Sequence, residues 1–432
     1  MDSWPLFPRV FPGTPFNSHR ETFILILIME IFFWYKCLDG ITCICPKKAL
    51  GIIAGLIFLV GTGPFTAHAG NPMVTLSGKM LQWTDRDITY HIDRGDLGPF
   101  PAEYIQSLVM KAFTEWNDTP NATLSIQFGG LLKDDVTRNN LGTYLSNPND
   151  GLNPVILDSD GAIIEQLFGK EASNSFLGIG GPLYDEINGE IFESEAIING
   201  KFLTDRSSEI ERAYSTLLHE FGHFLGLDHS QLHVDFAFDD DPVNNLFLPA
   251  MFPVEPEDRF ATQSLLPDDR FTLSYAYPDE EKMDQFASIS GVVARPFGDI
   301  VQGANVVAVK VDSPLIHTYS IVSDLFINQT GEFAFLFLPP GEYELFIEPI
   351  FENFWNSSGV GPFTDSPNSP SFIDPVIKEY YNGPRENGFI NRDNPQDKVT
   401  ITVNAGESED NILFISNEEK SASNFVSWYL YE

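Results

Sequence analysis

The chain has 432 residues, of which 43% are hydrophobic, so it is long enough for two or three domains with ordinary cores. Its 25 basic and 61 acidic side chains give a formal net charge of −36. That charge argues against a nucleic-acid partner, because phosphate binding needs a basic patch. An acidic surface favours basic substrates, although a salty habitat or calcium sites would explain the charge equally well.

The N-terminal 69 residues are predicted to be a leader. Residues 49–67 form an apolar stretch after Lys47-Lys48, and Ala67-His68-Ala69 is a small-residue cleavage pattern. These features are typical of a secretory signal peptide, which we place at residues 46–69. Residues 1–45 would then be an over-extended reading-frame start. An uncleaved anchor is the alternative; after cleavage we expect a secreted, extracellular protein without a stable membrane span.

All three cysteines lie in this predicted leader, at Cys37, Cys43 and Cys45. A chain that starts at Gly70 would contain none. We therefore expect no disulfide, no thiolate metal ligand and no catalytic cysteine in the mature protein.

Residues 74–200 show strand and helix patterns in turn. Asp87–Asp93 alternate in polarity as a half-buried strand does. A helix is predicted after Pro101, because apolar residues then recur at helical spacing. That apolar stripe consists of Ile105, Leu108, Ala112 and Trp116. Further strands are predicted at residues 122–128, 154–157 and 190–199.

An acidic turn, Asp158-Ser159-Asp160-Gly161, follows the strand at 154–157. The carboxylates of Asp158 and Asp160 could bind calcium through their oxygens. The full spacing of a calcium loop is missing, and a plain Asp–Gly turn explains the same residues equally well.

The pattern H-E-x-x-H-x-x-G-x-x-H spans residues 219–229. His219 and His223 are four residues apart, so on a helix they lie one turn apart on the same face and can bind one metal ion. Gly226 allows a positive φ that ends the helix and brings His229 back as a third ligand. Three nitrogen ligands leave one coordination position open, as in catalytic zinc sites. Glu220 stands beside the first ligand as a general base.

Two further features bear on this motif. The helix is predicted to begin near Ser207, with Ser208 and Glu211 as a capping box. His233, four residues beyond His229, is a rival third ligand, which the turn at Gly226 disfavours. Met251, within Pro249-Ala250-Met251-Phe252-Pro253, fits a turn that supports the site, although a buried methionine can also simply fill a core.

The runs HEFGHFLGLDHS and PAMFP together resemble the matrixin branch of the metzincins, and residues 266–278 resemble its last helix. The resemblance covers roughly residues 78–280. It implies an α+β catalytic domain over 70–280, with a mixed twisted sheet and long helices, and zinc endopeptidase activity. It also places residues 190–199 at the edge strand beside the cleft, where an extended peptide can pair.

A second domain is predicted at residues 286–416, after a polar linker at 279–285. Short strands bounded by turns favour an all-β sandwich. They are expected at residues 289–293, 303–309, 331–335, 340–347 and 398–403. Runs such as SGVV and LPPGEY resemble the carboxypeptidase regulatory-like (transthyretin-like) domain, with a long insertion at 350–396. A tail follows at 417–432. Nothing in the sandwich indicates catalysis, so we expect a stabilising or binding module of unidentified ligand.

These features together predict a secreted zinc metalloendopeptidase that acts on proteins or peptides. His219, His223 and His229 would hold the zinc, Glu220 would be the base, and Gly226 and Met251 would support the site. One alternative is an extracellular adhesion protein that keeps zinc for structure, which would have no use for Glu220. A zinc hydrolase of non-peptide amides is a third hypothesis.

Overall fold

The computed structural model describes residues 72–145, 150–204, 207–239, 241–254, 264–350, 376–389 and 395–417. The predicted leader, most of the predicted insertion and nearly all of the tail lie outside this range. Among the described residues, no helix is both long enough and apolar enough to cross a membrane.

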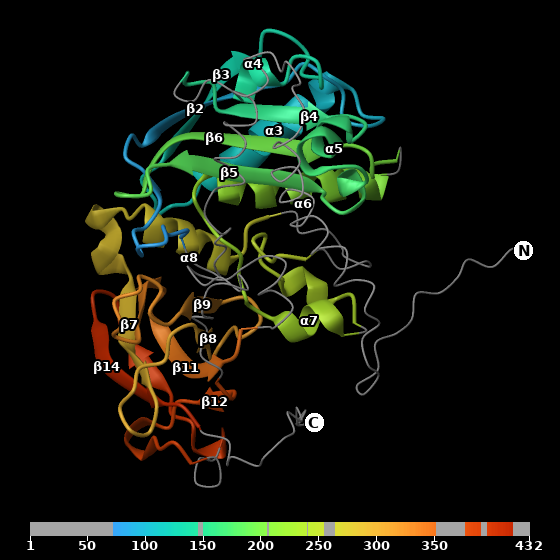
Figure 1. The fold of residues 1–432 in the computed structure, drawn as a ribbon. Helices are drawn as coiled ribbons and strands as arrows, with labels where there is room; N and C mark the ends of the chain where they lie inside the picture. The colour runs from blue at the N-terminus through green and yellow to red at the C-terminus, as the bar shows by residue number, and fades with distance from the viewer. Residues whose placement is uncertain are drawn as a thin grey trace, which may run out of the picture.

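A six-stranded mixed sheet forms the centre of the N-terminal half, which we define as residues 72–278 (Figure 1). Its strands are β1 (Gln82–Trp83), β2 (Asp87–Ile92), β3 (Ser125–Leu131), β4 (Pro154–Asp158), β5 (Gly178–Tyr184) and β6 (Glu190–Asn199). The order is β1-β6-β4-β2-β3, and these five strands run parallel to their neighbours. Strand β5 pairs antiparallel with β6.

Helices cover both faces of this sheet. Helices α3 (Ala102–Asn117) and α6 (Ser207–Phe224) share one core with alternate residues of β2, β4 and β6. The short helices α4 (Gly142–Leu145) and α5 (Ala162–Phe168) pack on the opposite face. The apolar stripe predicted for the first helix is confirmed, except that Leu108 is only partly buried while Val109 and Phe113 are fully buried.

The predicted edge strand differs from the observed one. Residues 190–199 form β6, which pairs with β1, β4 and β5 and is therefore an interior strand. The strand at the edge beside α6 is β5, which the sequence patterns did not indicate. Its sequence, GIGGPLY, is rich in glycine and contains a proline, and both residue types are depleted in strands.

The described part of the C-terminal half, residues 287–417, contains eight strands and two short 3-10 turns. The strands are β7 (Ala287–Ala294), β8 (Asn305–Lys310), β9 (Thr318–Val322), β10 (Glu332–Leu338), β11 (Gly341–Glu348), β12 (Glu379–Tyr380), β13 (Ile401–Val403) and β14 (Ser408–Ile415). One sheet has the order β10-β7-β14. The other has the order β12-β11-β8-β9, with β13 paired to β11. Both sheets contribute side chains to one core.

The two halves meet at helix α8 (Pro267–Ala276) and at the short helix α7 (Val234–Phe238). Phe271 of α8 belongs to the core of the C-terminal half, and its ring lies 5.5 Å from that of Tyr319. Arg270, the preceding residue, pairs at 2.6 Å with Glu115 of α3. Two adjacent residues of α8 therefore contact different halves of the protein: Arg270 contacts the N-terminal half and Phe271 the C-terminal half.

Candidate metal centre

Helix α6 presents two histidines on one face, and a glycine turn brings up a third. His219 and His223 are separated by one helical turn. Gly226 ends the helix with a φ of 82°, in the left-handed region where a residue without Cβ is unstrained. Its N–H donates to the carbonyl of His223. The backbone then reverses, and His229 returns towards the helix.

The ring nitrogens of the three histidines converge. Nε2 of His223 lies 3.1 Å from Nε2 of His219 and 3.1 Å from Nε2 of His229. The three ligand atoms all lie within 4.8 Å of one another, and in the described part of the chain no second trio of His, Cys, Asp or Glu gathers in this way. His233 is not part of the group. The structure thus brings together the three histidines that the motif predicted.

Two of the imidazoles are held in the tautomer that a metal ligand needs. Nδ1–H of His219 donates to the Ala250 carbonyl at 2.7 Å, and Nδ1–H of His223 donates to the Leu227 carbonyl at 2.9 Å. Each Nε2 therefore carries a lone pair. Lone pairs that face each other at 3.1 Å repel unless a cation lies between them. Tetrahedral zinc with bonds of about 2.0–2.1 Å separates its ligand nitrogens by about 3.3 Å, so these residues fit zinc.

A protonated histidine ring could not bind a metal ion. At His223, burial prevents this protonation. Removal of the ring from water lowers the pKa of His223 to about 4, because the charged imidazolium is disfavoured there. The ring is therefore neutral at physiological pH, as a ligand must be.

Met251 packs against α6 at Gly222, the residue before His223. A Cβ at Gly222 would be only 2.1 Å from the Met251 sulfur, so this glycine lets the helix settle on the turn. The Asp269 carboxylate of α8 accepts the N–H groups of Ala250 and Met251 at 2.9 and 3.0 Å. Ala250 in turn holds His219. Asp269 was not singled out from the sequence, since nothing local marks its contact with residues about twenty positions earlier.

Glu220 is buried where α6 packs against the edge strand β5. A Cβ at Gly178 would lie 2.7 Å from the Glu220 side chain, and one at Gly180 would lie 2.4 Å from its carbonyl oxygen. Burial raises the pKa of the Glu220 carboxyl to about 8, and the N–H of Gly180 opposes that shift by donating to the carboxylate. A base with a pKa near the working pH suits proton transfer. The two glycines were missed because their strand was missed.

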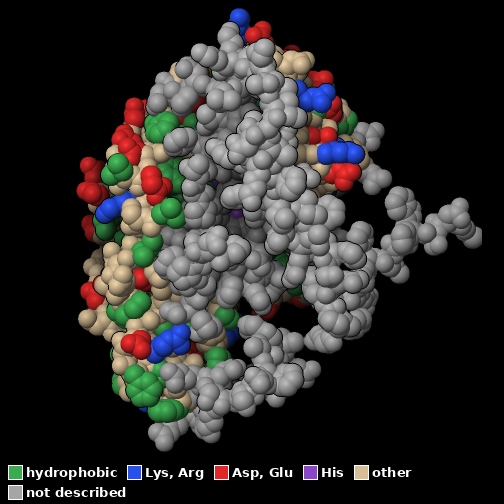
Figure 2. Space-filling view, viewed as in Figure 1, with side chains coloured by type: hydrophobic (Ala, Val, Ile, Leu, Met, Phe, Trp, Pro, Cys, Tyr) green, Lys and Arg blue, Asp and Glu red, His purple; other side chains and the backbone are tan. Residues whose placement is uncertain are grey.

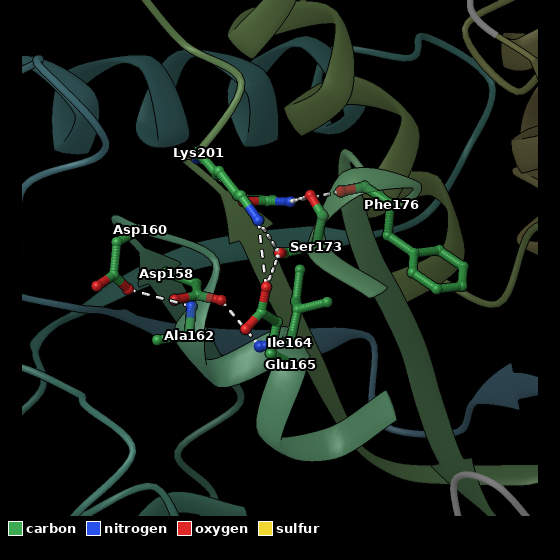
Figure 3. Close-up of polar contacts among 9 residues, drawn as sticks. Asp158, Asp160, Ala162, Ile164, Glu165, Ser173, Phe176 and Lys201 are labelled. Carbon is green, nitrogen blue, oxygen red and sulfur yellow. Dashed lines mark hydrogen bonds and ion pairs between the residues drawn. The ribbon is translucent and has the colours of Figure 1, made fainter. Parts of the chain in front are cut away.

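The acidic turn at residues 158–160 is occupied by backbone contacts (Figure 3). Asp158 accepts the N–H of Ile164 at 2.9 Å, and Asp160 accepts that of Ala162 at 3.1 Å. Both carboxylates thus bind the first turn of α5, which is the role of a plain Asp–Gly turn. Nearby, Lys201 binds Glu165 and Ser173. Calcium binding at Asp158 and Asp160 stays a prediction.

Helix α6 begins at Ser207, as predicted. The side chain of Ser208 lies outside the described residues, so the predicted capping box with Glu211 stays a prediction. Asp240, which precedes the Met251 turn, and residues 255–263, which follow it, are also outside the described range.

Residues 192–237 match the model of the M43 peptidase family, described as pregnancy-associated plasma protein-A. The matched segment runs from β6 through α6 into α7 and contains all three histidines. The match supports a metzincin-type zinc metallopeptidase. Peptides are accordingly the substrate class that the family indicates. No curated protein matches the chain.

Proposed function

We propose that this protein is a secreted zinc endopeptidase with a catalytic domain of the matrixin type. The observation that carries the proposal is the convergence of three histidine Nε2 atoms, with two of the rings held in the tautomer of a metal ligand. Glu220, which follows His219 on the same helix, is buried beside them. A site that held zinc only for structure would have no use for a carboxylate at that position.

His219, His223 and His229 would hold the zinc. When bound, zinc polarises a carbonyl as a Lewis acid and lowers the pKa of water. Glu220 takes a proton from the attacking water and passes it to the amine that leaves when the peptide bond breaks. The N–H of Gly180 orients this carboxylate, and the packing of Gly178 against it limits its movement.

Strand β5 is the proposed platform for the substrate. Among the described strands β5 pairs with β6 only, so its other edge has no partner strand there (Figure 1). The same strand packs against Glu220 of α6. An extended peptide can add to such an edge through main-chain hydrogen bonds. Asp and Glu side chains recur along the described rim of the face in Figure 2, in keeping with the preference for basic substrates that the net charge of −36 suggests.

The C-terminal half would be a carboxypeptidase regulatory-like sandwich. The two sheets around one core and the strands at the predicted positions of β7, β8, β10, β11 and β13 support this proposal. Secretion would follow from the signal peptide at residues 46–69 and the A-x-A site that ends at Ala69.

The test compares the purified protein with its Glu220→Gln variant, in zinc content and in hydrolysis of casein. We expect one zinc per chain in both, and cleavage by the unmutated protein alone. Proteolysis by the Glu220→Gln protein would refute the role of the base. Zinc in both without cleavage by either would favour the extracellular binding protein instead.

A further inference from the structure

Strand β9 of the C-terminal half is an edge strand whose residues are all buried. Among the described strands it pairs with β8 only, yet each residue of Thr318–Val322 is buried. An edge strand normally leaves a row of backbone groups open to solvent. Here the N-terminal half covers that edge through α8, and Val322 also packs on the segments that flank the Met251 turn.

The first contact is a two-step hydrogen-bond path from β9 to Ser230, the residue after the third histidine. The backbone N–H of Ser320 donates to Oδ1 of Asp268 at 2.9 Å. Oδ2 of the same carboxylate accepts the hydroxyl of Ser230 at 2.6 Å. Ser230 directly follows His229, and Asp268 is only 1% exposed. One buried carboxylate therefore bridges the C-terminal half and the loop that positions His229.

The second contact is apolar and reaches the Met251 turn from the other side. Val322 of β9 and Ile350 form a buried cluster with Leu248 and Phe252, which flank the turn. Residues of α7 pack on the same cluster. Ser230 also donates its N–H to the carbonyl of Met251 at 2.8 Å, so the two contacts converge on one unit.

These contacts exceed what a tether between independent domains requires. The affinity of a protein for its metal typically falls 10–100-fold when a hydrogen bond that supports a ligand is removed. Here such bonds come in part from a strand roughly ninety residues further along the chain. We propose that strand β9 is a structural part of the metal centre, in which Asp268 acts as the positioning residue for His229 and Val322 braces the Met251 turn. This inference rests on the proposed function only in taking His229 as a ligand.

The first experiment uses a matched pair of substitutions in the full-length protein, Val322→Ala and Val306→Ala. Both valines are buried, and they lie on neighbouring strands of one sheet. Val306 belongs to the core of the C-terminal half, whereas Val322 contacts the segments beside the turn. We expect similar losses of thermal stability, but only Val322→Ala should weaken zinc binding, by about ten-fold in competition with a chelator.

The second experiment separates the hydrogen-bond path from general stability. Asp268→Ala removes both acceptors and should weaken zinc binding about ten-fold, whereas Asp268→Asn keeps an acceptor for Ser320 and should retain most of the affinity. Ser323→Ala is the control, because it removes buried hydrogen bonds of the same sheet away from the site. Within the described part of the chain the Ser320 hydroxyl has no hydrogen-bond partner, so Ser320→Ala should leave the affinity unchanged.

Amide exchange of the metal-free protein provides a readout that does not depend on zinc. Asp268→Ala and Val322→Ala should accelerate exchange at residues 228–233, and the control variants should not. Equal zinc affinity and equal exchange in Val322→Ala and Val306→Ala would overturn the proposal. An unmutated protein that binds no zinc would refute the proposed function, while the exchange comparison would still decide whether β9 braces this loop.

Discussion

The substitution Gly180→Ala should abolish most of the proteolytic activity, whereas Gly181→Ala should leave it unchanged. The added Cβ at Gly180 would lie 2.4 Å from the carbonyl oxygen of Glu220 and 3.1 Å from its carboxylate. At Gly181, one position along the strand, it would meet nothing within 4 Å. Since successive residues of a strand face opposite sides, the two substitutions differ only in direction.

The magnitude follows from the distances. Carbon and oxygen ordinarily approach to about 3.3 Å, so β5 or α6 must move by about 1 Å to accept alanine at Gly180. A displacement of that size near a catalytic group costs about 100-fold in rate, or about 2.7 kcal/mol of transition-state stabilisation. The overpacking itself costs about 1–3 kcal/mol of stability. Gly181→Ala should instead gain about 0.5–1 kcal/mol, because alanine loses less backbone entropy on folding.

The assay is casein hydrolysis at saturating zinc, with denaturant unfolding of the same samples. We expect kcat to fall by about two orders of magnitude in Gly180→Ala and to remain unchanged in Gly181→Ala. Full activity of Gly180→Ala would show that Glu220 does not depend on its contact with β5. An equal loss in both variants would show that the strand as a whole, and not this contact, limits activity.

Four other outcomes are expected. Gly222→Ala should lower the unfolding free energy by about 1–3 kcal/mol, despite a gain in helix propensity of about 1 kcal/mol. Met251→Ala in the same chain should restore part of this loss, which a double-mutant cycle of unfolding free energies would measure. Burial beside Glu193 and Asp150 raises the pKa of Glu195 to about 8, so the unfolding free energy should fall as the pH rises from about 4.5 to 8. Glu195→Gln should reduce that slope in urea titrations and leave the part that Glu220 contributes. Chelation of zinc should lower Tm, by the equivalent of about 4 kcal/mol where free zinc is 1,000-fold above Kd. N-terminal sequencing of the secreted protein should begin at Gly70; a start well upstream would refute the predicted cleavage.

The histidine cluster could be predicted because its determinants are local. A spacing of four places two histidines on one helical face, and a glycine at the right distance reverses the chain, so eleven consecutive residues of the sequence specify most of the geometry. The structure brings the rings of His219, His223 and His229 together. His233, the rival, has a left-handed backbone instead and stacks on Phe236 at 4.6 Å between ring centroids.

The supports of the site could not be predicted, because they are brought together by tertiary packing. Strand β5 has poor strand propensity and exists because it pairs with β6. Strand β9 was not predicted either: Tyr319 and Ile321 alternate with polar residues and enter the core of the C-terminal half, but the contacts of Ser320 and Val322 with the N-terminal half depend on tertiary packing. The bond between Asp268 and Ser320 joins residues 52 positions apart, and no spacing rule indicates it.

The position of α8 between the halves bears on when the protein becomes active during its synthesis. The chain emerges from the ribosome with its N-terminus first. All three histidines and Glu220 are therefore made long before Ser320, and until β9 arrives Asp268 lacks the N–H that it binds across the boundary. If the brace is needed for a firm metal centre, a nascent chain that stops at the linker would be a poor peptidase. The order of synthesis would then delay a firm metal centre until the C-terminal half has been made.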